Sequence, residues 1–229
     1  MKKMLSFLFA ALLAVSLSGC GKEVPPEPKK TLVGFSQLGA ESDWRVANTA
    51  SMLQALCPEN GFEVLYDNAR QRQANQLLAV RNFIVQGVDI ILIAPAEETG
   101  WDAVLQEARD AGIPVIIVDR AVSVEDAGLY LTEIGSDFLT QGRRAVEWME
   151  QTLADAPASI LHIQGTYGAT AQLMRTKAIC DAVEAHDNWH FAGQLAGDYT
   201  ESKAYEEVGD FLKTGAKFNI LYSENDNMT

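Results

Sequence analysis

The chain has 229 residues, of which 48% are hydrophobic and 21% are charged, and its formal net charge is −13 at pH 7. This balance is typical of a folded globular protein and excludes a disordered or membrane-embedded one. The excess of acidic residues makes nucleic acid a poor partner, because phosphate backbones are bound by lysine and arginine. The length allows one large domain or two small ones.

The first twenty residues have the layout of a secretory signal. Lys2 and Lys3 precede an apolar run over residues 4–15, which is too short to span a bilayer. The run leads into Leu-Ser-Gly-Cys ending at Cys20, which resembles the bacterial lipobox. We therefore expect a signal peptide over residues 1–19 and a lipid anchor on Cys20. An uncleaved anchor helix, or a secreted protein with an incidental cysteine, is the alternative.

The next segment, residues 20–30, joins this cysteine to the folded part of the chain. It contains GKEVPPEPKK, which has three prolines and no apolar periodicity. Such a composition is typical of an extended tether. Removal of the signal also removes two lysines and no acid, so the mature chain is more acidic still.

From residue 31 onward, apolar runs of strand length alternate with helical segments. Most of these runs lack a two-residue alternation, as in strands of parallel sheets that are covered on both faces. The predicted strands are 31–35, 62–66, 88–94, 114–118, 130–134, 159–164, 189–195 and 217–222. The predicted helices are 44–57, 72–86, 101–111, 138–153, 170–186 and 202–214. This order predicts an α/β fold with right-handed crossovers.

Open, doubly wound sheets are favoured over an eight-stranded barrel. The connection over residues 119–129 carries no predicted helix, and none follows the last strand, whereas a barrel needs a helix after each strand. Cys57 and Cys180 lie in different predicted helices, far apart in the chain, and we expect two buried free thiols. A disulfide between them is the alternative for an exported protein.

Polar residues follow nearly every predicted strand. In both architectures ligands bind beyond the carboxyl ends of parallel strands, so these residues predict a binding edge. They are Ser36-Gln37, Asp67-Asn68, Pro95, Asp119-Arg120, Ser136-Asp137, Gly165-Thr166, Asp198-Tyr199 and Ser223-Glu224-Asn225-Asp226.

No catalytic or metal-binding motif accompanies this edge. His162, His186 and His190 lack metal-site spacing, and the sequence has no P-loop, GxSxG or dinucleotide fingerprint. We predict no metal and no cofactor. An enzyme stays possible, because a carboxylate pair such as Asp119 and Asp226 can perform acid and base chemistry without any motif.

The residues at the strand ends suit a neutral sugar. An aromatic plane such as Trp44 can cover the C–H face of a sugar ring, while Asp119 and arginine side chains can bind adjacent hydroxyls. Each residue also has a plainer interpretation. Trp44 can be a core residue, Asp119 and Arg120 a local ion pair, Arg175 a solvated helix residue, and Asn225 a turn residue.

Six segments together resemble one family, the type I periplasmic sugar-binding proteins of ABC importers, and most closely its galactofuranose-binding and ribose-binding members. The segments are GFSQLGAESDWR (34–45), QANQLLAVRNFIVQGVDIILIAPAEETGW (73–101), IIVDR (116–120), IQGTYGATAQLMR (163–175), GDYTESK (197–203) and YSENDNM (222–228). The resemblance covers the chain from Thr31 onward.

The resemblance implies two Rossmann-like lobes with parallel sheets, which hold a monosaccharide in the cleft between them and close by a hinge. The first lobe would be 31–136 and the second 137–229. The implied ligand residues are Glu41, Ser42, Asp43, Trp44, Arg45, Asp119, Arg120, Arg175 and Asn225, with Tyr199 as a further wall. The implied protein is not an enzyme. It is an exported, lipid-anchored monomer that delivers sugar to the membrane subunits of an ABC importer.

Other functions compete with this one. A sugar sensor that presents its ligand to a chemoreceptor or sensor kinase would have the same site, and a sugar-processing enzyme is less favoured. A repressor of the LacI type shares the lobes, but it needs a basic helix-turn-helix where this chain has its signal.

Two departures from the family pattern matter. Members of the family continue beyond the segment that contains Asn225, so we expect an incomplete second lobe and exposed sheet edges that favour aggregation. Glu224 and Asp43 stand where the family often has other residues, and we expect them to add negative charge at the mouth of the site.

Overall fold

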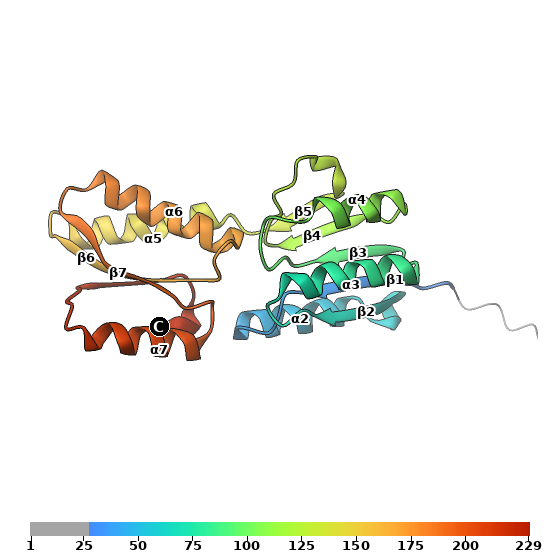
Figure 1. Cartoon of the computed structure of the whole chain (residues 1–229), viewed down its shortest axis with the longest axis horizontal. Coiled ribbons are helices and arrows are strands. Elements are labelled where there is room, and N and C mark those ends of the chain that lie inside the picture. The colour runs from blue at the N-terminus through green and yellow to red at the C-terminus, as the bar shows by residue number, and fades with distance from the viewer. Residues whose placement is uncertain (1–27) are drawn as a thin grey trace, which may run out of the picture.

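The computed structural model describes residues 28–229, which form two parallel sheets flanked by helices (Figure 1). The strand order is β2-β1-β3-β4-β5 in the first sheet and β7-β6-β8 in the second. Every strand pair is parallel. Two separate open sheets exclude the barrel and confirm the predicted α/β class. The predicted signal peptide and Cys20 lie outside the described residues.

The first sheet is covered on both faces. Its strands are β1 (Thr31–Gln37), β2 (Phe62–Asn68), β3 (Ile90–Ile93), β4 (Val115–Asp119) and β5 (Thr132–Gly135), and its helices are α2 (Asp43–Ala55), α3 (Gln73–Gln86) and α4 (Asp102–Asp110). Val33 and Phe35 pack against α2, whereas Ile91 and Ile93 pack against α3 and α4. This double coverage explains why the strands lack a polar alternation.

The second sheet follows the same plan. It contains β6 (Ala158–Gln164), β7 (Trp189–Ala196) and β8 (Ile220–Ser223), with α5 (Phe138–Leu153), α6 (Thr170–Ala185) and α7 (Glu201–Lys213) around it. Ile160 of β6 packs with Met149 of α5 and Ile179 of α6. Figure 1 shows α7 on the opposite face of this sheet.

Several short segments differ from the predictions. The first helix ends at Ala55 rather than at Cys57, because Pro58 begins a separate 3-10 turn, η1 (Pro58–Asn60). Another 3-10 turn, η2 (Ala127–Leu129), lies in the connection that was predicted to carry no helix, and it delays the start of β5.

The two cysteines are free thiols in the structure, but the prediction that both are buried was wrong. Cys57 is half-buried because it lies in the bend between α2 and η1 and not inside a helix. Cys180 lies in α6 and is also half-buried, and the partial burial raises the pKa of its thiol.

The carboxyl ends of the two sheets face each other (Figure 1). Two pairs of residues join the loops on the β4 side of the first sheet to the second half, and in one pair Thr170 Oγ1 also donates to Ala121 O at 3.2 Å. Glu98 N donates to Gly168 O at 2.9 Å, and Ala121 N donates to Thr170 Oγ1 at 2.9 Å. On the β2 side, Gln71 Nε2 donates to Asp198 O at 3.3 Å.

None of the helices among residues 28–229 has both the length and the apolarity of a membrane span.

Candidate functional site

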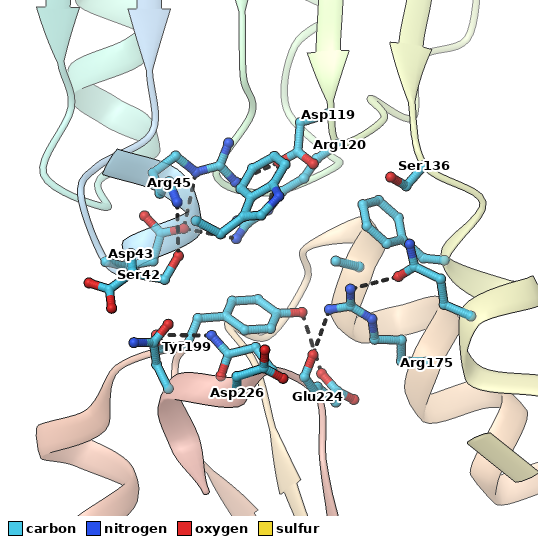
Figure 2. A pocket seen from close by; sticks show the side chains of 17 residues that line it. Ser42, Asp43, Arg45, Asp119, Arg120, Ser136, Arg175, Tyr199, Glu224 and Asp226 are labelled. Atoms are coloured by element: carbon cyan, nitrogen blue, oxygen red, sulfur yellow. Dashed lines mark hydrogen bonds and ion pairs between the residues drawn. The ribbon is translucent and has the colours of Figure 1, made fainter. Parts of the chain in front are cut away.

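A cavity of about 600 Å³ lies between the carboxyl ends of the two sheets. All ten binding residues that were predicted from the sequence line it: Glu41, Ser42, Asp43, Trp44, Arg45, Asp119, Arg120, Arg175, Tyr199 and Asn225. The lining also includes Ser136, Phe138, Gln141, Ala171, Glu224, Asp226 and Asn227. Figure 2 shows that side chains from both halves of the chain point into this space.

The start of α2 forms one wall of the cavity. Ser42 is the N-cap of this helix, and its hydroxyl accepts a hydrogen bond from Arg45 N at 3.2 Å. Trp44 is 55% exposed, whereas Arg45 is only 2% exposed. The guanidinium carbon of Arg45 lies 4.9 Å from the centroid of the Trp44 ring, so a buried cation supports the exposed indole. The interpretation of Trp44 as a core residue was wrong.

Four buried charges lie behind this wall, and three of them, Arg45, Asp119 and Arg120, are labelled in Figure 2. Arg45 contacts both carboxylates, Nε at 3.1 Å from Glu41 Oε1 and Nη2 at 2.5 Å from Asp119 Oδ2. Arg120 lies 3.7 Å from Glu41 and donates to Ala96 O at 3.1 Å. Two guanidinium groups and two carboxylates thus balance each other in charge. Burial is the main cause that lowers the pKa of Arg120, and the positive charge of Arg45 adds to it.

The backbone at Asp119 is strained to reach this cluster. Asp119 has a φ of 68°, in the left-handed region that residues other than glycine seldom adopt. Its carboxylate meets Arg45 across a sequence separation of 74 residues. The ion pair between adjacent Asp119 and Arg120, which the sequence left open, is long at 4.0 Å.

Two buried atoms of this cluster have no hydrogen-bond partner among residues 28–229. They are Glu41 Oε2, an acceptor, and Arg45 Nη1, a donor. An unsatisfied buried polar atom costs about 1–3 kcal/mol. Both residues line the cavity, and these two atoms lie buried beneath its surface.

The second half of the chain supplies the opposite wall. Tyr199 is buried, and its ring centroid lies 5.1 Å from the guanidinium carbon of Arg120. Arg175 donates to Glu224 O at 2.8 Å and to Gln141 Oε1 at 2.7 Å. Burial, followed by the negative charge of Glu224, raises the pKa of Tyr199, so its phenol is neutral and can donate.

Asn225 combines a turn role with its position in the cavity. Its Oδ1 accepts from Met228 N at 3.2 Å and caps the 3-10 turn η3 (Asp226–Met228). Its Nδ2 donates to Tyr199 O at 3.4 Å. The Asn225 side chain therefore contacts the loop that carries Tyr199, and Asn225 also lines the cavity.

The expectation that Glu224 adds charge at the mouth was wrong. Glu224 is only 4% exposed, because its carboxylate turns inward and accepts hydrogen bonds from residues below the cavity. Asp43, in contrast, is exposed in the first turn of α2.

Sequence reasoning missed four further lining residues. One is Asn227, in the 3-10 turn η3. The other three are Phe138, Gln141 and Ala171. They lie within the first turns of α5 and α6, the helices that follow β5 and β6. Most of the predicted binding residues lie directly after strands or at the start of the first helix, whereas the starts of the other helices lie at the same edge of the sheets.

Comparison with known proteins identifies the family. Residues 33–229 match the family model described as the periplasmic binding protein domain. The chain belongs to the periplasmic binding protein family. The two-sheet α/β fold described above is thus that of a periplasmic binding protein.

Among curated proteins, this periplasmic binding protein is 37% identical to the galactofuranose-binding protein YtfQ of Escherichia coli (strain K12). The match covers 86% of this chain and 62% of that relative's length. A solved structure from Mycobacterium smegmatis, in complex with β-D-fucofuranose, is 40% identical to this chain with a TM-score of 0.81. The match covers 86% of this chain and 65% of that one. The binding protein of an arabinose ABC transporter from Shewanella sp. ANA-3, bound to α- and β-L-arabinofuranose, is 40% identical with a TM-score of 0.81 over 86% and 66% of the two chains.

Proposed function

We propose that this periplasmic binding protein captures a neutral monosaccharide in the cavity and delivers it, as a monomer, to the membrane subunits of an ABC importer. The observation that carries the proposal is the wall of the first lobe, where an exposed indole lies beside a charge-balanced cluster with one free acceptor and one free donor. No metal, cofactor or covalent step is needed for this role.

The chemistry of the wall suits an uncharged ring. Trp44 can cover the C–H face of a sugar, and adjacent hydroxyls can bind carboxylate and guanidinium groups of the residues that line the cavity, such as Asp119 and Arg175. A charged ligand would disturb the balance of the two arginines and two carboxylates. The sugars of the three relatives, galactofuranose, fucofuranose and arabinofuranose, support a furanose ring.

We propose that residues 31–136 and 137–229 act as two lobes that close on the sugar. A ligand that contacts both lobes shifts the population toward the closed form, and the importer would bind that form. The Arg120–Tyr199 contact supports this proposal, because it joins a side chain of the first range to one of the second across the cavity.

A screen of sugars tests the function. We expect L-arabinose, D-galactose, D-fucose or D-ribose to raise the melting temperature of the protein. At a concentration of about 100 times Kd, a ligand adds roughly 2.7 kcal/mol to the free energy of unfolding. Isothermal titration calorimetry then measures the affinity. If no monosaccharide in the panel binds, the proposed function is wrong.

Trp44→Ala is expected to weaken sugar binding about 10- to 100-fold, because the ring loses its apolar platform. Calorimetry on the sugar selected by the screen measures the change. Trp148→Ala is the matched control, since Trp148 is a similarly exposed tryptophan on α5 and does not line the cavity. Equal affinity of Trp44→Ala and the control would contradict the assignment of the indole to the site.

The proposed anchor makes a separate prediction. Cys20→Ser is expected to move the protein from the membrane fraction to the soluble fraction of an exporting bacterium, because the thioether-linked lipid can no longer form. Fractionation and mass spectrometry of the intact protein measure the change. Cys57→Ser is the control and is expected to leave the protein at the membrane. An unmodified Cys20 would refute the anchor.

A further inference from the structure

The carboxylate of Glu224 lies below the cavity and is completely buried. Its Oε2 accepts from Gly165 N at 2.8 Å and from Tyr199 Oη at 3.4 Å. Its Oε1 accepts from Thr176 Oγ1 at 2.7 Å and lies 3.1 Å from His162 Nε2. One side chain thereby ties together β6, α6 and the loop after β7.

The hydrogen bonds of His162 define its tautomer. Its Nδ1 lies 3.3 Å from Gln194 Nε2, and an amide nitrogen can only donate, so Nδ1 is the acceptor. Nε2 then carries the hydrogen and donates to Glu224. All four partners of the carboxylate are therefore donors, which matches the four lone-pair positions of an ionised carboxyl group.

The same residue also holds the cavity wall through its backbone. Glu224 O accepts from Arg175 Nη1 at 2.8 Å. Tyr199, held by the carboxylate, supplies the ring that contacts Arg120 of the first lobe. Asn225, the next residue, donates to Tyr199 O. Glu224 thus contacts the wall of the second lobe at two points, the Tyr199 hydroxyl through its carboxylate and the Arg175 guanidinium through its backbone oxygen.

We propose that Glu224 is a positioning residue for sugar binding, which acts by holding Tyr199 and Arg175 in their binding geometry. This inference rests on the proposed function. The negative charge of Glu224 also contributes to the raised pKa of both Tyr199 and Tyr222, after burial, so both phenols remain donors beside it.

Glu224→Gln in the full chain tests the proposal. Glutamine keeps the shape of the side chain but replaces one acceptor oxygen with an amide donor, which then meets groups that also donate. We expect the affinity for L-arabinose or D-galactose, whichever binds the wild type, to fall about 10- to 100-fold in calorimetry. Glu150→Gln is the control, because Glu150 makes a similar but half-exposed pair with His186 at 3.5 Å, away from the cavity. It is expected to bind like the wild type.

A double-mutant cycle separates positioning from general destabilisation. In a Tyr199→Phe background the hydroxyl contact is already absent, so the added effect of Glu224→Gln should be at least threefold smaller than in the wild type. An equal loss in both backgrounds would overturn the proposal. Tyr199→Phe alone keeps the ring and the fold, and wild-type affinity of this variant would also overturn it.

Hydrogen exchange of the sugar-free protein provides an independent measurement. We expect Glu224→Gln to speed amide exchange about tenfold at Gly165 and residues 197–200, with no change in β1 and β3. Unchanged exchange there would refute the proposal even if no sugar is found. If the wild type binds no sugar but Glu224→Gln shows the expected faster exchange, the transport function alone is refuted.

Discussion

Replacing Arg45 with methionine is expected to reduce the free energy of unfolding by about 3–5 kcal/mol and to abolish sugar binding. Methionine fills much of the same volume, but it leaves Glu41 and Asp119 as buried carboxylates with only Arg120 near them. Removal of one partner from a buried ion pair leaves a charge without compensation, which accounts for the size of the effect. Sugar binding fails as well, because the variant lacks the support of Trp44 and the free Nη1 donor.

Urea denaturation and calorimetry measure the two effects. Arg81→Met is the matched control, because Arg81 pairs with Glu107 at 2.8 Å on the outside of the same half, where both side chains are about 40% exposed. An exposed pair of this kind contributes about 0–1 kcal/mol, so the control should change little. If Arg45→Met is as stable as the control, the cluster does not stabilise the fold.

Gly165→Ala is expected to weaken sugar binding more than about 100-fold and to destabilise the protein by about 1–3 kcal/mol. A Cβ atom at this position would lie 1.9 Å from Tyr199 Cζ, so the methyl group would occupy the space of the ring. The ring cannot move aside freely, because Tyr199 is buried and its hydroxyl contacts Glu224. The alanine therefore forces the wall of the second lobe out of place.

Gly209→Ala is the control for this substitution. Gly209 lies inside α7, and a Cβ there would meet no atom within 4 Å. Alanine is favoured over glycine in a helix by about 0.5–1 kcal/mol, so the control should be slightly more stable than the wild type and bind sugar normally. Thermal unfolding and calorimetry on both variants decide the matter. Normal binding by Gly165→Ala would show that the position of Tyr199 is unimportant for the sugar.

The sequence predicted the class of fold and the edge where the site lies, because these depend on local patterns. Continuous apolar runs indicated strands covered on both faces, and such strands place the residues after them at one edge. The burial of Glu224 depends instead on His162, Thr176 and Tyr199, which lie 62, 48 and 25 residues away. A buried, fully paired carboxylate and one at the mouth of a cleft look the same in a sequence.

The contacts between the halves are unevenly distributed, and this has a consequence for ligand release. Beside β4, two hydrogen bonds of 2.9 Å and one of 3.2 Å join the two halves, whereas beside β2 the Gln71–Asp198 bond measures 3.3 Å. An average hydrogen bond contributes only about 0.5–1.5 kcal/mol net, and a long one contributes at the low end. We therefore expect the molecule to swing about a pivot beside β4, and the bound sugar to supply most of the energy that keeps the β2 side shut.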